Sequence, residues 1–372
     1  MTRTLLVLLA SAWACVFAVA AAAQTALTDL EPEFDALMGQ VIERGVPGAI
    51  LRIENETTVL EFARGVADLE TGEPIRASDL IRMGSVTKLY TAAVIHALVG
   101  EGELDLDCPA ANYLPAATLD GIANGDTVTL RQLLNHTGGV PDFYDEDGHT
   151  PFDLAHTPLV PELVLETVRG EPATNAPGEA YHYSNTGYHI LALVAEAVTG
   201  EAMDALYRRH VFEPAGLQAT QYETLFTETD RIHGYSGDVG ALTDHYRWLE
   251  NTGPDGGMLA TTADISALLG ALFTETGSLR DIGAAMLSQR VEASRSEDYG
   301  LGVSILKRRR TGEEFHGHTG GIHGYLTIAV HDPQRGVRIV LHINSEDEEA
   351  LIAFYGGVLD TLAGSPALPA GR

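Results

Sequence analysis

The stretch Met83-Gly84-Ser85-Val86-Thr87-Lys88, followed by the uncharged run from Leu89 to Gly100, decides how we interpret this chain. The run is apolar on every side, which is typical of a helix that is buried all round. Ser85 and Lys88 stand three positions apart at its start, so their side chains share a face and can touch. A lysine in a dry site has a lowered pKa and can take the proton of a serine hydroxyl. The pattern predicts a nucleophile beside its base.

A serine three residues before a lysine is a weak signal by itself, because both lysines of the chain have one. The second pair is Ser304 and Lys307, in a segment whose pattern predicts a strand ending in a polar turn. Side chains alternate along a strand, so this pair would point to opposite faces. We therefore retain only the pair at the start of the helix. A solvated lysine is the ordinary alternative for Lys88, but a dozen uncharged residues follow it.

The amino-terminal residues have the pattern of a secretory signal peptide, assigned to residues 1–23. Arg3 precedes an uncharged run from Thr4 to Ala23, and three alanines end it. We expect cleavage near Ala23 and a secreted or periplasmic protein without stable membrane insertion; the alternative is an uncleaved anchor, because the run is long enough to span a bilayer. Cleavage would remove Cys15 and leave Cys108 alone, which excludes an internal disulfide.

The formal net charge of −29 argues against nucleic acids and anionic membrane surfaces as partners. The partner that we expect from the catalytic motifs is a small-molecule or peptide substrate with an acyl carbonyl. The sequence does not define an oligomeric state.

Both ends of the chain carry patterns of one α/β layer. Apolar residues at helical spacing run from Leu30 to Ile42 and stop at Gly45, and β-rich runs at 49–53 and 59–63 predict a hairpin. Strand patterns return at 315–318, 325–330 and 337–343, the last with its apolar residues on one face. A closing helix follows, with Ser345 and Glu348 as its predicted capping box. We expect an antiparallel sheet flanked by the two terminal helices.

The middle of the chain predicts a mainly helical half, with helical patches at 128–134, 159–168, 188–198 and 265–273. We expect one domain over residues 24–364. Its α/β part would comprise about 28–100 and 290–364, and its helical part about 101–289. Residues 365–372 are expected to form a flexible tail.

Tyr183-Ser184-Asn185 follows a Pro-Gly turn and precedes a helical patch. Ser184 or Asn185 would serve well as a helix N-cap. The functional alternative is a phenol that relays a proton and an amide that holds a substrate carbonyl. The residues alone leave both interpretations open.

Gly317-His318-Thr319-Gly320-Gly321 lies between two strand patterns, where glycine lets a backbone approach a ligand and N–H groups can face a carbonyl oxygen. The similar His136-Thr137-Gly138-Gly139 follows a helical patch and suits a helix stop better. His316, His318 and His323 could suggest a metal site. Neither a cysteine nor an Asp or Glu at an obvious ligand spacing completes a ligand set, so we expect no metal.

The ordered set S-x-x-K, Y-S-N and H-T-G resembles the serine β-lactamase and penicillin-binding DD-peptidase family, in its class C-like branch. The resemblance extends over nearly all of the expected mature chain. It implies the β-lactamase/transpeptidase-like fold, no cofactor, and an acyl-enzyme formed at Ser85. The resemblance implies that Lys88 and Tyr183 share the acid and base steps and that Asn185 orients Lys88 and the substrate. It also implies that His318 and Thr319 line the far wall of the site beside Gly320. The N–H groups of Ser85 and Gly321 would form the oxyanion hole.

Two positions depart from the family pattern. His318 stands where most β-lactamases of the family have a lysine, and a histidine can be neutral at pH 7. Gly138 stands where the helix-end motif usually carries serine. We therefore expect a secreted D-alanyl-D-alanine carboxypeptidase-like or esterase-like hydrolase; the alternatives are a class C-like β-lactamase and a non-catalytic binding module. The loop from Asp142 to His156 is a candidate rim or an ordinary solvated loop.

Overall fold

The computed structural model describes residues 27–145, 150, 152, 157–222, 232–237, 240–246 and 253–364. The predicted signal peptide, the predicted tail and most of the candidate rim loop lie outside these ranges. The first described helix of the sheet layer, α2 (Glu31–Glu43), buries Phe34, Met38 and Val41 on one face, as its spacing predicts.

The centre of the molecule is a nine-stranded sheet in which every neighbouring pair is antiparallel, with the order β3-β2-β1-β14-β13-β12-β11-β10-β9. Its strands are β1 (Gly48–Glu54), β2 (Val59–Asp68), β3 (Glu73–Pro74), β9 (Val291–Ser294), β10 (Glu297–Tyr299), β11 (Ser304–Arg308), β12 (Glu313–Ile322), β13 (Tyr325–Asp332) and β14 (Val337–Ile343). Strands from the two ends of the chain meet where β1 pairs with β14. The predicted antiparallel sheet is confirmed.

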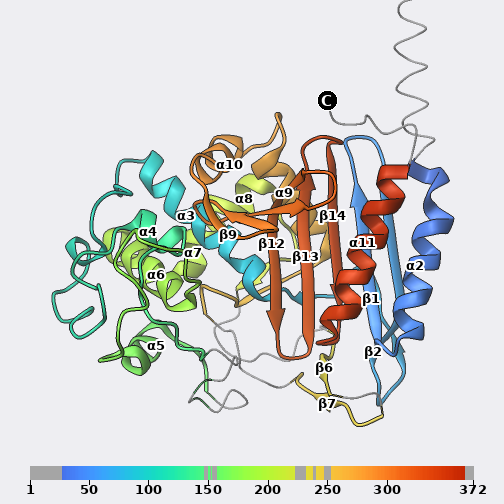
Figure 1. Ribbon diagram of the computed structural model, residues 1–372, viewed down its shortest axis with the longest axis horizontal. Coiled ribbons are helices and arrows are strands. Elements are labelled where there is room, and N and C mark those ends of the chain that lie inside the picture. Colours follow the sequence, from blue (N-terminus) through green and yellow to red (C-terminus); the bar gives the residue numbers. More distant parts are fainter. Residues whose placement is uncertain are drawn as a thin grey trace, which may run out of the picture.

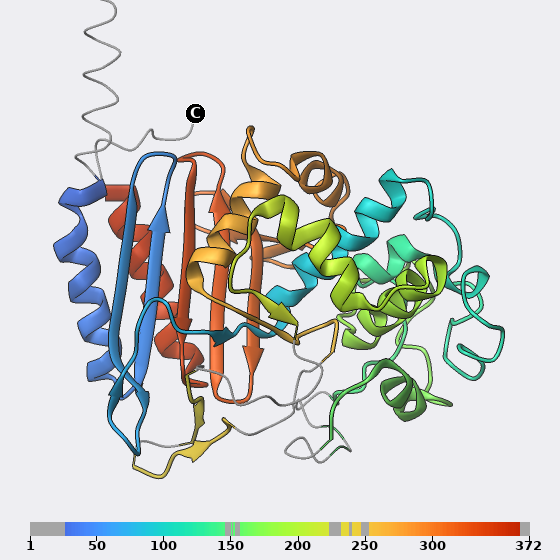
Figure 2. The ribbon, with the colours of Figure 1, turned by 180° about the vertical axis from the view of Figure 1, so that it is seen from behind.

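The two faces of the sheet are covered by different helices (Figures 1 and 2). Helices α2 and α11 (Glu348–Gly364) lie together on one face, and α9 (Thr262–Phe273) lies on the other. Alternation along β1 sends Leu51 to the core under α2 and α11, and Ile50 to the core on the opposite side. A sheet with both faces covered has two buried layers of side chains, which fixes the register of its strands.

The predicted cap of the closing helix is wrong. The Asp347 carboxylate accepts the N–H of Ala350 at 2.9 Å, and the Ser345 hydroxyl accepts the N–H of Asp347 at 3.2 Å. Glu348 is therefore inside the helix, and an aspartate, which is an equally good cap, takes the place expected for serine.

The middle of the chain supplies most of the remaining helices, which lie beside the sheet in Figure 1. They are η2 (Ala110–Asn112), α4 (Leu130–Leu134), α5 (Pro161–Val168), α6 (Asn185–Thr199), α7 (Met203–Tyr207), η3 (Arg208–Phe212), α8 (Glu213–Ala215) and α10 (Arg280–Met286). Short strands β4 (Ile81–Arg82), β5 (Gln221–Tyr222) and β8 (Met258–Ala260) form a separate small sheet, and β6 (Tyr235–Ser236) pairs with β7 (Thr243–Asp244). The four helical patches predicted here correspond to α4, α5, α6 and α9.

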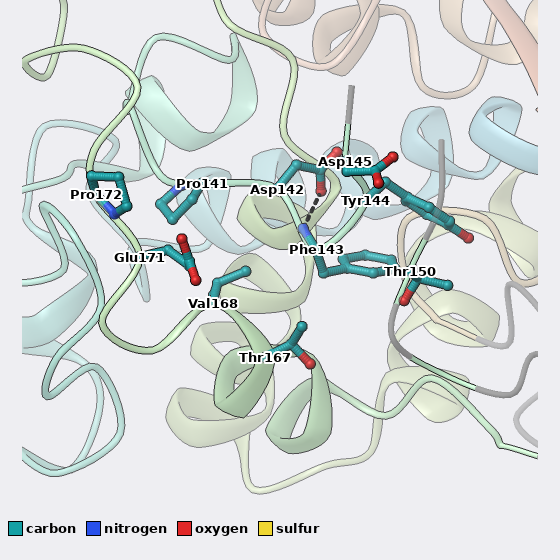
Figure 3. A pocket seen from close by; sticks show the side chains of 10 residues that line it. All are labelled: Pro141, Asp142, Phe143, Tyr144, Asp145, Thr150, Thr167, Val168, Glu171 and Pro172. Atoms are coloured by element: carbon teal, nitrogen blue, oxygen red, sulfur yellow. Dashed lines mark hydrogen bonds between the residues drawn. The ribbon is translucent and has the colours of Figure 1, made fainter. Parts of the chain in front are cut away.

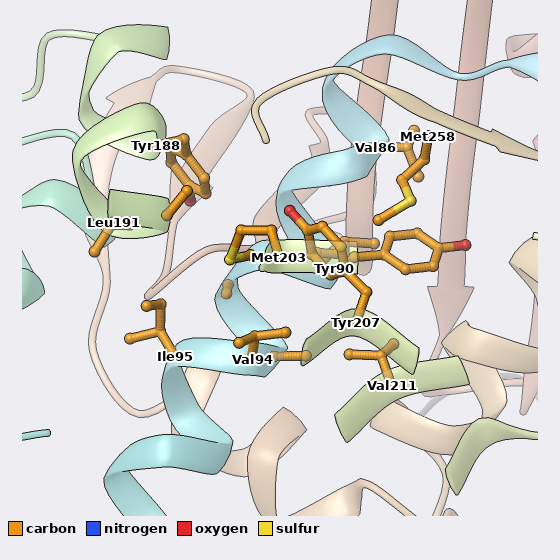
Figure 4. Packing of buried hydrophobic residues seen from close by; sticks show 14 of the residues in the cluster. Val86, Tyr90, Val94, Ile95, Tyr188, Leu191, Met203, Tyr207, Val211 and Met258 are labelled. Carbon is orange, nitrogen blue, oxygen red and sulfur yellow. The ribbon is translucent and has the colours of Figure 1, made fainter. Parts of the chain in front are cut away.

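Helix α3 (Thr87–Gly100) joins the sheet to the helical part and begins directly after η1 (Gly84–Val86). Figure 4 shows it surrounded by apolar side chains of α6, α7 and η3, among them Leu191, Met203 and Val211. The prediction of a helix buried all round is confirmed. Within the described ranges, no helix combines the length and the apolar composition that crossing a bilayer requires.

Candidate active site

Ser85 is the one residue between Ile81 and His96 that is not buried. It lies in the single turn η1, whose first residue, Gly84, has a φ of 52°. A Cβ atom at Gly84 would lie 2.8 Å from the carbonyl oxygen of Gly321, so a side chain there would separate η1 from β12. The glycine allows the serine to reach the surface at the end of a helix that is otherwise enclosed.

The Lys88 ammonium group lies 3.0 Å from the Ser85 hydroxyl, as the three-residue spacing predicts. It also donates to Asn185 Oδ1 at 2.7 Å and to the backbone carbonyl of Asp255 at 3.0 Å. Lys88 is fully buried, and burial lowers its pKa from 10.5 to about 8, although the carboxylates of Asp255 and Asp142 oppose this. A lysine with this pKa has an appreciable unprotonated fraction near neutral pH.

The side chain of Tyr183 lies against both members of this pair. Its ring centroid is 4.9 Å from Lys88 Nζ. Burial raises its pKa well above 10, and hydrogen bonding with Ser85 works in the opposite direction. Tyr183 is therefore protonated at neutral pH. It can donate its proton only if it receives another proton at the same time. The neighbouring Ser184 caps α6 by accepting the N–H of Gly187 at 3.3 Å, so the N-cap prediction is also confirmed.

Asn185 is the first residue of α6 and turns its amide toward Lys88. The amide nitrogen donates to Asp142 Oδ2 at 2.8 Å. The amide oxygen is thereby left to accept from Lys88, and the two polar ends of the side chain both have partners.

The segment His318–Gly321 lies where β12 has a strand partner on one side only. Residues 313–317 pair with β11, whereas residues 316–322 pair with β13. The open side of the later residues faces η1: a Cβ atom at Gly320 would be 1.9 Å from the Met83 carbonyl oxygen and 3.1 Å from the Ser85 backbone nitrogen. Thr319 and Gly321 are exposed, and alternation along the strand places them on the face opposite to Gly320.

The His318 side chain is buried and both of its ring nitrogens have partners. Nδ1 contacts the carbonyl of Thr319, and Nε2 lies 2.8 Å from the Tyr299 hydroxyl. A carbonyl can only accept, so Nδ1 carries the proton and Nε2 accepts from Tyr299. Burial lowers the pKa of His318 to about 3, so the ring is neutral at pH 7. His318 therefore contributes no positive charge to this wall of the site.

The sequence analysis did not predict a role in the site for His136, whose ring packs against the ring of Tyr183. The two ring centroids are 4.2 Å apart, and His136 Nδ1 accepts the N–H of Ser184 at 3.1 Å. His136 follows α4 with a φ of 59°, so its motif is the helix stop that the sequence predicts. The signal that could have identified it was its likeness to the H-T-G motif. Gly138 is also constrained, because a Cβ atom there would lie 2.7 Å from a methyl carbon of Val128.

A buried pair of His189 and Asp255 lies beneath Lys88 and was not predicted either. His189 Nε2 is 2.8 Å from Asp255 Oδ1, and both side chains are almost fully buried. Burial raises the pKa of Asp255, but the charge and hydrogen bond of His189 outweigh it, and the net direction is downward. The pair fixes the loop whose carbonyl group accepts from Lys88.

A cavity of about 560 Å³ lies beside the site, and Figure 3 shows the residues that line it. Asp142 contributes to the cavity wall while its carboxylate binds Asn185, so the cavity is adjacent to Lys88 and Ser85 without containing them. Of the aromatic residues of the candidate rim, Phe143 is buried and packs on Tyr144, whose ring centroid is 4.4 Å away. Residues 146–149, 151 and 153–156 of that loop lie outside the described ranges.

The arrangement can perform acyl transfer, because a base and a protonated phenol both lie against the half-buried hydroxyl of Ser85. Among the residues that the structure describes, no group of three or more His, Cys, Asp or Glu side chains is placed to hold a metal ion.

Comparison with known proteins agrees with this geometry. A family model described as Beta-lactamase matches residues 28–356. Penicillin-binding protein 4* of Bacillus subtilis is 27% identical over 86% of this chain and 73% of its own length. Esterase EstB of Burkholderia gladioli is 32% identical over 51% of this chain and 50% of its own length.

Solved structures show the same fold. D-amino acid amidase from Ochrobactrum anthropi SV3, in complex with L-phenylalanine amide, superimposes with a TM-score of 0.78 and 25% identity over 90% of this chain and 99% of the amidase. The match of the family model over most of the chain, together with these relatives, establishes that the chain belongs to the β-lactamase family and is one of its serine hydrolases.

Proposed function

We propose that this chain is a cofactor-free acyl hydrolase that acts through a covalent ester between Ser85 and the acyl group of its substrate. The observation that carries the proposal is the 3.0 Å contact between the Ser85 hydroxyl and the buried, pKa-lowered amine of Lys88. With a pKa of about 8, roughly a tenth of Lys88 is unprotonated at pH 7. Tyr183 keeps its proton under the same conditions. The lowered pKa of Lys88 and the raised pKa of Tyr183 favour Lys88 as the first base and Tyr183 as the proton relay.

In the proposed reaction, Ser85 Oγ forms a bond to the substrate carbonyl carbon while its proton passes to Lys88. The N–H groups of Ser85 and Gly321 donate to the oxyanion, since η1 and β12 bring these two backbone segments together. The bond to the leaving group then breaks, and the leaving group takes the proton by way of Tyr183. A water molecule attacks the acyl-enzyme by the same proton route in reverse, which releases the acid and restores Ser85.

We propose esters and amides that lack a carboxylate as the preferred substrates, ahead of D-alanyl-D-alanine peptides and β-lactams. His318 is neutral and engaged with Tyr299, so it offers no charge to the carboxylate that such peptides carry on the leaving group. The relatives named esterase and D-amino acid amidase support this direction, and the penicillin-binding relative supports the carboxypeptidase alternative.

The test compares hydrolysis of 4-nitrophenyl acetate, D-alanine 4-nitroanilide and a diacetyl-lysyl-D-alanyl-D-alanine peptide by the wild type and by Ser85→Ala. We expect turnover of the ester and the anilide that disappears in Ser85→Ala, with the peptide cleaved more slowly. Faster cleavage of the peptide would establish the carboxypeptidase alternative. Absence of turnover and of acylation in a folded sample would favour a non-catalytic binding module.

We also propose that the chain is exported and that residues 1–23 are removed. The proposal rests on Arg3, the uncharged run to Ala23 and the small residues before Gln24. The amino-terminal sequence of the mature protein tests it: a start near Gln24 is expected, and a start at Met1 in the exported fraction would contradict it.

A further inference from the structure

Asp142 joins the loop after α4 to the amino end of α6 through both of its carboxylate oxygens. Oδ1 accepts three backbone N–H groups, from Phe143 at 2.9 Å, Asn185 at 3.0 Å and Thr186 at 3.3 Å. Oδ2 accepts the side-chain amide of Asn185 at 2.8 Å. All of these partners are donors, so they select the ionised carboxylate, even though burial raises the pKa of Asp142.

The two oxygens perform different tasks. Oδ1 binds backbone groups and so stabilises the loop and the start of α6, where a negative charge also complements the helix dipole. Within the described part of the chain, the hydrogen bond to Oδ2 comes from the side chain of Asn185. An amide has one accepting and one donating end, and a carboxylate can face only the donating end. With the nitrogen of Asn185 held toward Asp142, its oxygen must face Lys88, and it does so at 2.7 Å.

We propose that Asp142 is a positioning residue of the active site, which fixes the side-chain amide of Asn185 so that its oxygen accepts from Lys88. This inference rests on the proposed function and goes beyond it, because none of the three motifs contains Asp142. Without the carboxylate, the Asn185 amide could rotate and turn its NH₂ group toward Lys88. Two donors would then face each other in a dry site, and Lys88 would no longer be held against the Ser85 hydroxyl.

The surroundings of Lys88 make the effect measurable. Two carboxylates raise its pKa against burial, Asp255 from the loop before β8 and Asp142 from the loop after α4. Burial keeps the imidazoles of His136 and His318 neutral, and the rings of Tyr183 and Tyr188 lie within 5.3 Å of Nζ. Removing the charge of Asp142 and the accepting oxygen of Asn185 therefore lowers the pKa of Lys88.

The substitution Asp142→Asn separates the two tasks because it is nearly isosteric. Its oxygen can still accept the backbone N–H groups, while its NH₂ group now faces Asn185. We expect kcat/KM for 4-nitrophenyl acetate to fall about 10- to 100-fold, the value of one hydrogen bond to a charged group. We expect Tm to change by about 3 °C or less. Asp126→Asn, which removes an exposed carboxylate from the loop before α4 and away from the site, is the matched control and should behave as the wild type.

A readout independent of turnover comes from the lysines, since the chain contains only Lys88 and Lys307. In protein labelled with [ε-¹³C]lysine, each gives one signal, and Lys307→Arg assigns them. We expect the titration midpoint of Lys88 to fall by about one pH unit in Asp142→Asn. An unchanged midpoint would overturn the inference, even if activity were lost.

The swapped variant Asp142→Asn/Asn185→Asp provides the rescue test. A carboxylate at position 185 has an oxygen on both sides, so it accepts from Lys88 whichever way it is turned, and the amide introduced at position 142 can donate to it. We expect the swap to recover at least tenfold of the kcat/KM lost in Asp142→Asn. Wild-type kcat/KM in Asp142→Asn, or a loss that the swap deepens, would overturn the inference. Ser85→Ala tests the proposed function separately. If the wild type is active and Ser85→Ala is inactive, the proposed function holds whatever the result for Asp142→Asn.

Discussion

Lys88 should make the stability of this protein rise with pH in a range where most of its other groups do not titrate. Its pKa is about 8 in the folded chain and 10.5 in the unfolded reference. Between these values the unfolded chain binds more protons than the folded one, so the free energy of unfolding increases with pH. Below pH 8 the folded protein carries the cost of a buried ammonium group, and that cost disappears as the pH passes 10.5.

The magnitude follows from the difference between the two pKa values. Each pH unit corresponds to about 1.4 kcal/mol, so the lowered pKa amounts to about 3 kcal/mol between pH 7 and pH 10.5. Lys88→Met keeps a side chain of similar length and lacks the titration. The wild type should therefore gain about 3 kcal/mol relative to Lys88→Met over this interval, whatever the absolute stability of the variant.

Urea denaturation of both proteins at pH 7 and pH 10.5 measures this difference, and other titrating groups cancel in the comparison. Lys307→Met is the matched control, because it removes the other lysine from β11, where it is half-buried and paired with Asp298. We expect the control to differ from the wild type by less than about 1 kcal/mol. Parallel pH dependence in the wild type and Lys88→Met would show that Lys88 titrates alike in the folded and unfolded chain, and that its pKa is not lowered by burial.

Three further outcomes are expected. Tyr183→Phe should lower kcat/KM for the ester about 10²- to 10⁴-fold with unchanged folding, as loss of a proton-transfer group does, and near-normal turnover would remove Tyr183 from the mechanism. Gly320→Ala should cost about 1–3 kcal/mol in urea denaturation, because its Cβ would meet the Met83 carbonyl at 1.9 Å; wild-type stability would contradict the close approach. Gly138→Ser should destabilise the chain by about 1 kcal/mol, and less in a Val128→Ala background, whereas equal costs in both backgrounds would show that the two sites are uncoupled.

Local patterns were sufficient for much of the fold and for part of the site. The apolar run after Lys88 predicted α3, and the alternation of residues 337–343 predicted the face that β14 turns to α11. The spacing of Ser85 and Lys88 predicted their contact, because a helical turn sets the distance without help from distant residues. Strand spacing likewise excluded Ser304 and Lys307, which lie on β11 and bind different carboxylates.

What the sequence did not disclose depends on segments far apart along the chain. Asp142 reaches Asn185 across 43 positions, and Asp255 reaches His189 across 66. Neither residue type nor spacing marks such contacts, since an aspartate in a loop is ordinarily solvated. The same holds for His318, whose neutral state is set by burial and by Tyr299 rather than by its motif.

The proposed mechanism depends on acylation of Ser85, and intact mass measurement of the protein tests this step most directly. The wild type is mixed with 4-nitrophenyl acetate or a penicillin, quenched in acid within the first turnovers, and weighed beside Ser85→Ala. We predict an increase equal to the acyl group in the wild type, located by peptide mapping at Ser85, and no increase in Ser85→Ala. An adduct that persists in Ser85→Ala, or turnover of the ester without any adduct at Ser85, would contradict the mechanism.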